Sequence, residues 1–161
     1  MEASLCILAH NGHEEAARLI ESVRSIRDLE VEVVIGQQSC SDESLEWYMG
    51  HADARVGVTD RELWDYGFGY CRQKIADAAE HDWIISADCG EVWHDNPEYG
   101  GLVYVVEHNP DVPVFRVARG DPDIVRKVAV QEAPAEALTD DNGRIFDRRE
   151  MQWAGMIHEA L

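Results

Sequence analysis

Two kinds of hydrophobic pattern alternate along the first 96 residues of the chain. Short continuous apolar runs, each followed by polar residues or glycine, are typical of buried strands. Longer segments with apolar residues three or four positions apart are typical of amphipathic helices. Their alternation predicts an α/β fold with a mainly parallel sheet and helices on both of its faces. The expected strands cover residues 4–9, 32–35, 55–59 and 83–87, and the expected helices cover residues 13–26, 42–48 and 70–80.

One segment of this part interrupts the pattern. Residues 60–69 combine aromatic side chains with Gly67 and Gly69, and we expect them to form a loop. The helix over residues 70–80 then begins after this loop and places Arg72 near its N-terminus. There, a guanidinium group and backbone N–H groups can together bind a phosphate. A surface arginine paired with one of the many carboxylates explains the same position equally well.

The pattern weakens after residue 96 and predicts an extension of the same domain. Residues 98–107 have helical spacing, although Gly100 and Gly101 are unfavourable inside a helix. Residues 131–143 are acidic and predict a loop. The expected strands of this part cover residues 112–117 and 124–130, as an antiparallel pair, and then residues 144–146 and 153–157.

The chain of 161 residues has the length of one domain and is strongly acidic. It contains 14 lysine and arginine residues against 32 aspartate and glutamate residues, which gives a net charge of −18. Its only adjacent basic pairs are Arg126-Lys127 and Arg148-Arg149. Because like charges repel, this composition disfavours direct binding to nucleic acid or to an anionic membrane surface.

The cysteines and the N-terminal residues bear on the cellular compartment. The four cysteines form no C-x-x-C pair, which disfavours a zinc knuckle and suits reduced thiols in a cytosol. The N-terminus lacks the basic and apolar regions of a signal peptide. No stretch approaches the ~18 consecutive apolar residues of a membrane helix. We therefore expect a cytoplasmic protein without a membrane span.

Polar residues follow three of the expected strands, at the ends where ligands bind in open α/β sheets. They are His10-Asn11, Gln37-Gln38-Ser39 and Asp88 to Glu91. The carboxylates of Asp88 and Glu91 suit a divalent cation or ribose hydroxyl groups. A solvated turn that caps the next segment explains them equally well. For His158, beside Glu159, the spacing favours a partly buried histidine over a ligand.

Several common motifs are absent from the chain. The string HNGHEE at residues 10–15 has its histidines three positions apart rather than four, so it is not a zinc-protease motif. No G-x-G-x-x-G, P-loop or serine nucleophile-elbow sequence is present. Dinucleotide or ATP sites of those types and serine-hydrolase chemistry are therefore not expected.

Separated segments of the chain resemble the family 2 glycosyltransferases, which have the nucleotide-sugar-binding GT-A fold. The segments are ILAHNGHEE, VEVVIGQQSCSDES, GFGYCRQKIADAAEHDWIISADCGEVW and RIFDRREMQWAGMIHEAL. They are similar, in order, to the opening strand and loop of the family, its D-x-G-S-x-D-x-T loop, its arginine-containing helix with the D-x-D loop, and its closing W-x-G-x-[IV]-H-E segment. The resemblance implies a three-layer α/β/α sandwich with a mainly parallel central sheet and a small antiparallel C-terminal extension.

The resemblance also implies roles in binding a nucleotide-diphosphate sugar donor. Gln37 stands where the family usually has an aspartate that contacts the base, and Asp88 stands at the first aspartate of D-x-D, near the ribose and the metal. Arg72 stands at the arginine that helps to hold the donor nucleotide. The remaining implied donor-binding residues are His10 and Asn11, against the base, and Ser39.

The second aspartate of D-x-D, usually a metal ligand in the family, is Gly90 here. A glycine side chain offers no ligand, so a metal site would need Glu91 or His158 beside Asp88. The implied cofactor is Mn²⁺ or Mg²⁺. Gln37 is likewise neutral where the family has a carboxylate, which changes the expected base preference.

The implied reaction is a hexosyl transfer with inversion, by one in-line displacement, to an unidentified acceptor. A metal and Arg72 would stabilise the departing diphosphate, and a base would deprotonate the acceptor hydroxyl. The candidates for the base are Glu159 first, and then Asp121 and Asp123. Residues 1–96 would form the nucleotide-binding half and residues 97–161 the acceptor-side half of a single domain. The alternatives are a non-catalytic module of this fold that binds a nucleotide, a sugar or a partner protein, and an unrelated α/β nucleotide-binding protein.

Overall fold

The structure of the chain is a computed structural model, and it describes residues 1–95, 101–116 and 143–153. The strands are β1 (Glu2–Ala9), β2 (Glu30–Gln38), β3 (Ala54–Val58), β4 (Trp83–Ala87), β5 (Val114–Arg116) and β6 (Gly143–Asp147). The helices are α1 (His13–Arg24), α2 (Asp42–His51), α3 (Asp60–Asp77) and α4 (Gly101–Glu107). All six strands belong to one sheet in the order β3-β2-β1-β4-β6-β5.

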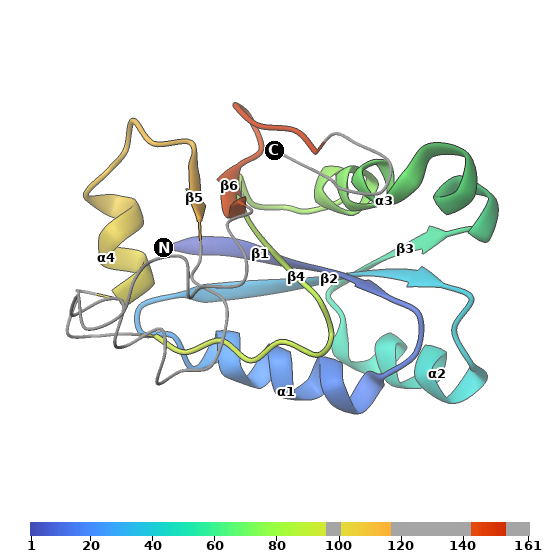
Figure 1. Cartoon of the computed structure of the whole chain (residues 1–161). Coiled ribbons are helices and arrows are strands. Elements are labelled where there is room, and N and C mark those ends of the chain that lie inside the picture. Colours follow the sequence, from blue (N-terminus) through green and yellow to red (C-terminus); the bar gives the residue numbers. More distant parts are fainter. Residues whose placement is uncertain (96–100, 117–142, 154–161) are drawn as a thin grey trace, which may run out of the picture.

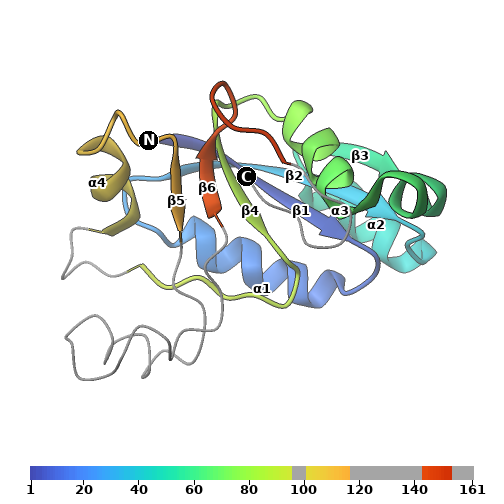
Figure 2. The ribbon, with the colours of Figure 1, turned by 45° about the horizontal axis from the view of Figure 1, so that its top comes forward.

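The sheet is mainly parallel with an antiparallel edge, as expected. Strands β1 to β4 run parallel to one another, whereas β6 is antiparallel to β4 and β5 is antiparallel to β6. Figure 2 shows β6 between β4 and β5, at the opposite side of the sheet from β3. The order of β3, β2 and β1 continues with β4 on the far side of β1, so the strand order reverses between β1 and β4.

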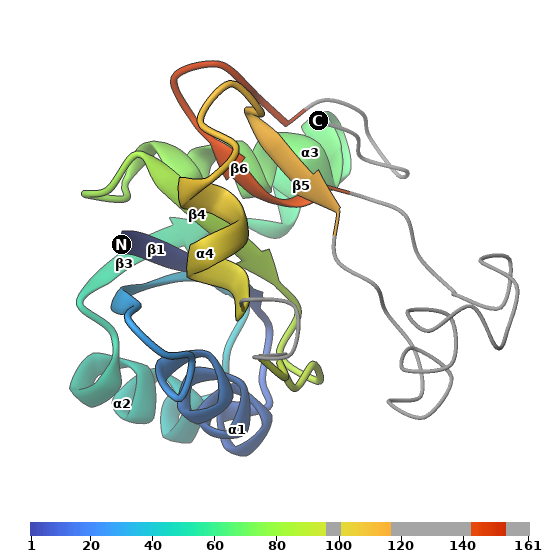
Figure 3. The same cartoon turned by 90° about the vertical axis from the view of Figure 1, so that its left-hand side faces the viewer.

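Helices cover both faces of the sheet, which confirms the three-layer α/β/α sandwich. Helices α1 and α2 lie on one face and α3 lies on the other (Figures 1 and 3). Alternate residues of β1 reach the two faces. Leu5 and Ile7 pack in a fully buried cluster with Leu19 of α1, and Cys6 packs in a second cluster with Ile75 of α3.

The contact between α3 and β2 depends on a glycine. A Cβ atom on Gly36 would lie 2.2 Å from Cδ1 of Ile75, a fully packed side chain of α3. We therefore expect Gly36→Ala to lower the free energy of unfolding by about 1–3 kcal/mol, because α3 must shift away from the sheet. Gly57→Ala on β3, where a Cβ meets no atom within 4 Å, is the matched control. Urea denaturation of both variants measures the difference, and equal stabilities would contradict this packing.

The expected loop over residues 60–69 is wrong, because this segment is the first half of α3. Thr59 caps the helix: its hydroxyl accepts a hydrogen bond from the backbone N–H of Glu62, and the Glu62 carboxylate accepts one from the backbone N–H of Thr59. The helix tolerates Gly67 as a kink with φ 82°. Arg72 lies in the early part of the helical segment that follows this kink, and its side chain is buried.

The same capping carboxylate gives the fold an acid-sensitive contact. A hydrogen bond from Lys74, followed by those from Thr59, lowers the pKa of Glu62 from 4.5 to about 2. Because the folded-state pKa is the lower one, its stabilising effect is complete above pH 4.5 and is lost as the pH falls towards 2. We expect Glu62→Gln to flatten the decrease of urea midpoint across this window. Glu43→Gln, at an exposed glutamate of α2, is the control and should keep the wild-type slope.

The remaining differences concern element boundaries and the C-terminal third. Strand β2 continues through Gly36 to Gln38, beyond the expected end at residue 35. Strand β5 pairs with β6, a pairing that we did not predict, and the expected pairing of residues 112–117 with 124–130 stays a prediction because residues 124–130 lie outside the described residues. The segments expected over residues 96–100, 117–142 and 154–161 lie outside the described residues. Among the described residues, no helix combines the length and apolar character that a membrane crossing requires.

Candidate functional site

The carboxyl ends of the parallel strands bring the predicted polar residues to one edge of the sheet. Ala9 at the end of β1 is paired with Gln37 of β2, and Ile7 is paired with Ala87 at the end of β4. The loops after β1, β2 and β4 therefore lie at the same edge of the sheet, and those after β2 and β4 flank the loop after β1 (Figure 1). This edge includes the point between β1 and β4 where the strand order reverses, which is where open α/β sheets bind ligands.

Hydrogen bonds fix the loop after β1 to the loop after β2. His10 Nδ1 lies 2.8 Å from the backbone oxygen of Gln38. The side-chain oxygen of Asn11 accepts a hydrogen bond of 2.8 Å from the backbone N–H of Ser41, the residue that caps α2. The hydroxyl of the buried Tyr48 donates to the backbone oxygen of Asn11 at 3.0 Å. His10 and Asn11 are thus held in place by β2 and α2.

The loop after β2 is fixed in turn to the start of α3 through Asp60. One carboxylate oxygen of Asp60 accepts hydrogen bonds from Ser39 Oγ at 2.6 Å and from Gln38 Nε2 at 2.8 Å. These bonds, Ser39 first, lower the pKa of Asp60. Asp60 was not among the predicted site residues. The signal that identifies it is its position directly after the N-cap residue Thr59, which places its carboxylate at the edge of the sheet.

Two arginines and two carboxylates form a network at the end of β4. Arg72 on α3 donates to Asp88 Oδ1 at 2.7 Å and to Ser86 Oγ at 3.3 Å. Arg144 on β6 places Nη1 3.7 Å from Asp88 Oδ2 and Nη2 3.7 Å from Glu91 Oε1. Both arginine side chains are about nine-tenths buried, and the Asp88 side chain is 40% exposed. The structure therefore brings together three residues that the sequence singled out and adds Arg144.

The segment after β6 closes over Arg72. The centre of the Trp153 ring lies 5.6 Å from the guanidinium carbon of Arg72. The backbone N–H of Trp153 donates to Gln73 Oε1 at 2.8 Å. Trp153 also packs edge-on against Phe146 of β6. Trp153, the tryptophan of the closing motif, and Arg144, the arginine of RIF, thus both belong to the site. Sequence reasoning did not include either among the site residues.

Gln37 has a buried side-chain nitrogen that needs a partner. The Nε2 atom is inaccessible to water and forms no hydrogen bond with the described residues. Burying an amide N–H without a partner costs about 1–3 kcal/mol. The side chain belongs to the last residues of β2, at the same edge of the sheet as His10 and Asp88. Because no water reaches this atom, an acceptor on a bound molecule meets it only after a change of the Gln37 side-chain rotamer.

The described residues alone do not fit a divalent cation. No group of three potential ligands among His, Cys, Asp and Glu occurs in the described ranges. Gly90 offers no side-chain oxygen, and the carboxylates of Asp88 and Glu91 both face Arg144. The third predicted ligand, His158, lies outside the described residues, as do the predicted bases Glu159, Asp121 and Asp123.

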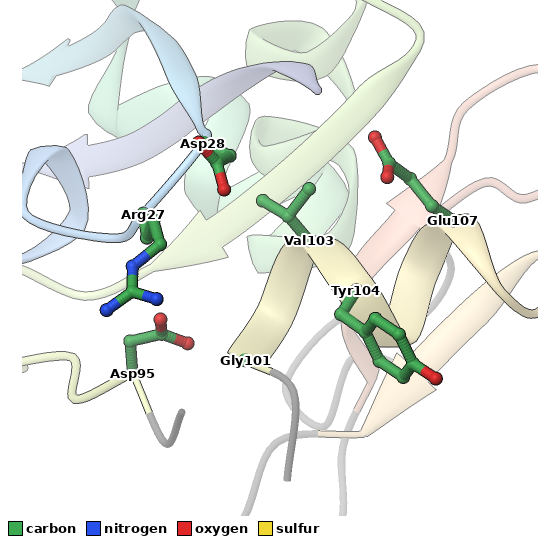
Figure 4. Close-up of a pocket in the computed structure, with 7 residues that line it drawn as sticks. All are labelled: Arg27, Asp28, Asp95, Gly101, Val103, Tyr104 and Glu107. Atoms are coloured by element: carbon green, nitrogen blue, oxygen red, sulfur yellow. The ribbon is translucent and has the colours of Figure 1, made fainter. Parts of the chain in front are cut away.

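A cavity of about 340 Å³ lies at the other end of the sheet. Figure 4 shows Arg27 and Asp28, which precede β2, on one side of it and Tyr104 and Glu107 of α4 on the other. Figure 3 places α4 beside the beginning of β1. This cavity is therefore separate from the edge that carries His10 and Asp88, and none of the predicted site residues lines it.

Solved structures share this fold at low sequence identity. The mannosyltransferase PcManGT from Pyrobaculum calidifontis, in complex with GDP-Man and Mn²⁺, is 16% identical with a TM-score of 0.59, over 94% of this chain and 47% of that one. Glucosyl-3-phosphoglycerate synthase from Mycobacterium tuberculosis, in complex with Mn²⁺, UDP and phosphoglyceric acid, is 14% identical with a TM-score of 0.51, over 91% and 56%. TarS from S. aureus is 18% identical with a TM-score of 0.55, over 77% and 24%.

The chain thus spans less than two thirds of the length of each of these structures. No curated protein matches it significantly. The sequence model of the family described as "Glycosyl transferase family 2" matches residues 4–157, which is nearly the whole chain. The order of the strands, the polar edge at β1, β2 and β4 and this match agree, and the chain belongs to glycosyl transferase family 2.

Proposed function

We propose that this chain binds a nucleoside diphosphate sugar at the carboxyl ends of β1, β2 and β4 and transfers the sugar to an acceptor. The observation that carries the proposal is the position of Asp88. It follows β4 beside the point where the strand order reverses, and the buried Arg72 holds it at 2.7 Å. A partly exposed carboxylate that is fixed in this way can accept hydrogen bonds from ribose hydroxyl groups.

The other residues of the edge have matching roles in the proposal. His10 and Asn11 lie against the nucleotide base, and Ser39 lies in the adjoining loop. After a change of its side-chain rotamer, the amide nitrogen of Gln37, which is buried in the free chain, donates to a carbonyl oxygen of the base and gains its missing hydrogen bond. A donor at this position favours a carbonyl acceptor on the base, whereas the aspartate usual in the family would favour an N–H group.

The proposed reaction is a hexosyl transfer with inversion, in one in-line displacement. The leaving diphosphate gains negative charge, so Arg72 and Arg144 lower the barrier by compensating the nearby carboxylates of Asp88 and Glu91. Glu159 is the proposed base for the acceptor hydroxyl, and Asp121 and Asp123 are the next candidates. In this scheme residues 1–96 form the nucleotide-binding half of one domain and residues 97–161 the acceptor-side half.

A divalent cation is a separate question from the roles of the residues above. The structures of PcManGT and of glucosyl-3-phosphoglycerate synthase contain Mn²⁺. In this chain, Mn²⁺ or Mg²⁺ would be held by Asp88, Glu91 and His158, which stays a prediction. Because the described donor set is incomplete, no step of the proposed reaction depends on the ion.

One observation favours a second candidate function. Gly90 replaces the second aspartate of D-x-D, and a side chain at this position would meet open space. A chain that has lost this carboxylate can retain nucleotide binding without transfer. This alternative is a non-catalytic nucleotide- or sugar-binding module of the same fold.

A panel of UDP-, GDP- and TDP-sugars, and the corresponding diphosphates, tests the proposal with and without Mn²⁺. We expect one nucleotide to raise the melting temperature of the protein, because a ligand that binds the folded state stabilises it. We also expect the matching donor sugar to be consumed, with release of the nucleoside diphosphate. Binding without consumption of any donor would support the non-catalytic module. Neither binding nor consumption would contradict both functions.

A further inference from the structure

The network at the end of β4 joins two strands that are far apart in the sequence. Asp88 and Glu91 follow β4, and Arg144 lies on β6, the antiparallel neighbour of β4. Arg72 reaches the same carboxylate from α3. The charges alternate in space as Arg72, Asp88, Arg144 and Glu91, so two positive and two negative groups lie side by side.

Burial distinguishes this network from the ion pairs on the surface. Arg72 and Arg144 are 7% and 8% exposed, whereas the side chain of Arg61, which pairs with Asp65 on α3, is 90% exposed. A surface pair contributes little to stability, but a buried guanidinium group must have its charge compensated. In a chain with 14 basic residues and a net charge of −18, two of the few positive charges are buried beside the carboxylates after β4.

Arg144 supplies, next to Asp88 and Glu91, the positive charge that a divalent cation would supply there. An ion held by Asp88 and Glu91 would compensate their negative charges and keep the two carboxylates together. Arg144 lies 3.7 Å from an oxygen of each carboxylate, on the two nitrogens of one guanidinium group. One planar guanidinium group thus lies beside both carboxylates and compensates part of their negative charge.

We infer that Arg144 is a positioning residue of the donor site, which holds Asp88 and Glu91 in place and compensates their charge so that a nucleoside diphosphate binds without a divalent cation. The inference rests on the proposed function. It assigns to this chain a donor site in which fixed arginines compensate the carboxylates that would otherwise repel the diphosphate. A divalent cation then adds to binding instead of being required for it.

Titration calorimetry with the nucleoside diphosphate identified in the panel tests the inference, in EDTA and in Mn²⁺. We expect the wild-type chain to bind in EDTA with an affinity within about tenfold of that in Mn²⁺. Arg144→Met should weaken binding in EDTA by about tenfold or more, because Asp88 and Glu91 then repel each other and the diphosphate. Mn²⁺ should restore most of the loss in this variant, and Arg144→Lys should be intermediate in EDTA.

The controls separate this role from a structural one. Arg24→Met removes the same charge from the exposed end of α1 and should leave both affinities unchanged. If Arg144 acts only on stability, Arg144→Met will weaken binding equally with and without Mn²⁺, and the inference fails. It also fails if the wild-type chain binds the nucleotide in Mn²⁺ but not in EDTA, although the proposed function then stands. If no nucleotide binds under either condition, the proposed function itself fails.

Discussion

Asp88→Asn is expected to lower the rate of donor-sugar consumption by about 10- to 100-fold, because a hydrogen bond to a charged group contributes about 1.5–3 kcal/mol. The carboxylate accepts a hydrogen bond from the buried Arg72 and lies near the buried Arg144. An amide at this position removes one negative partner from each of the two guanidinium groups and presents an N–H group towards the ribose. The steady-state rate of nucleoside diphosphate release, measured with the donor identified in the panel, gives the change directly.

A matched substitution shows whether this effect belongs to the site. Asp65→Asn also removes one carboxylate charge, but Asp65 pairs with the exposed Arg61 on the outer part of α3. We expect this variant to keep the wild-type rate within about twofold, because surface ion pairs contribute little. If Asp88→Asn and Asp65→Asn have the same rate, Asp88 does not take part in donor binding or transfer.

Phe146→Ala is expected to cause the largest loss of stability, about 3–5 kcal/mol in the free energy of unfolding. The Phe146 side chain on β6 is fully buried and packs edge-on against Trp153. Its removal leaves a cavity between β6 and α3 and frees the ring that covers Arg72. Urea denaturation measures the change in unfolding free energy, and donor consumption at a temperature where the variant is folded should also decrease.

The control for this variant is an aromatic residue on the surface. Tyr104 of α4 is 51% exposed, so Tyr104→Ala should change the stability by no more than about 1 kcal/mol. A loss below about 1 kcal/mol for Phe146→Ala would contradict the packing of β6 between β4 and β5 and, with it, the position of Arg144.

Strands β1 and β4 were predictable because each contains a continuous apolar run. Strand β4 has the expected bounds, and β1 differs only in its first residues. The helix over residues 60–69 was missed because Gly67 and the aromatic side chains favoured a loop. The sequence pattern of Thr59 and Glu62 is typical of a capping box at a helix start. The helix begins there, and Gly67 produces a kink in it.

The candidate site was predictable only as far as it follows from the ends of parallel strands. That rule selected His10, Gln37 and Asp88, and the structure places them at one edge. Arg144 could not be found in this way, because its place depends on the antiparallel insertion of β6 beside β4, which is a long-range pairing. Asp60 was missed for a local reason, since its segment was expected to be a loop.

Hydrogen–deuterium exchange with and without the bound nucleoside diphosphate tests the central claim most directly, because it reports where on the sheet the ligand binds. We expect the ligand to slow exchange in peptides that cover residues 8–12, 36–41 and 86–91, at the carboxyl ends of β1, β2 and β4. Peptides that cover residues 27–30 and 101–107, which border the cavity at the opposite end, should be unchanged. Slower exchange confined to those last two segments would contradict the account.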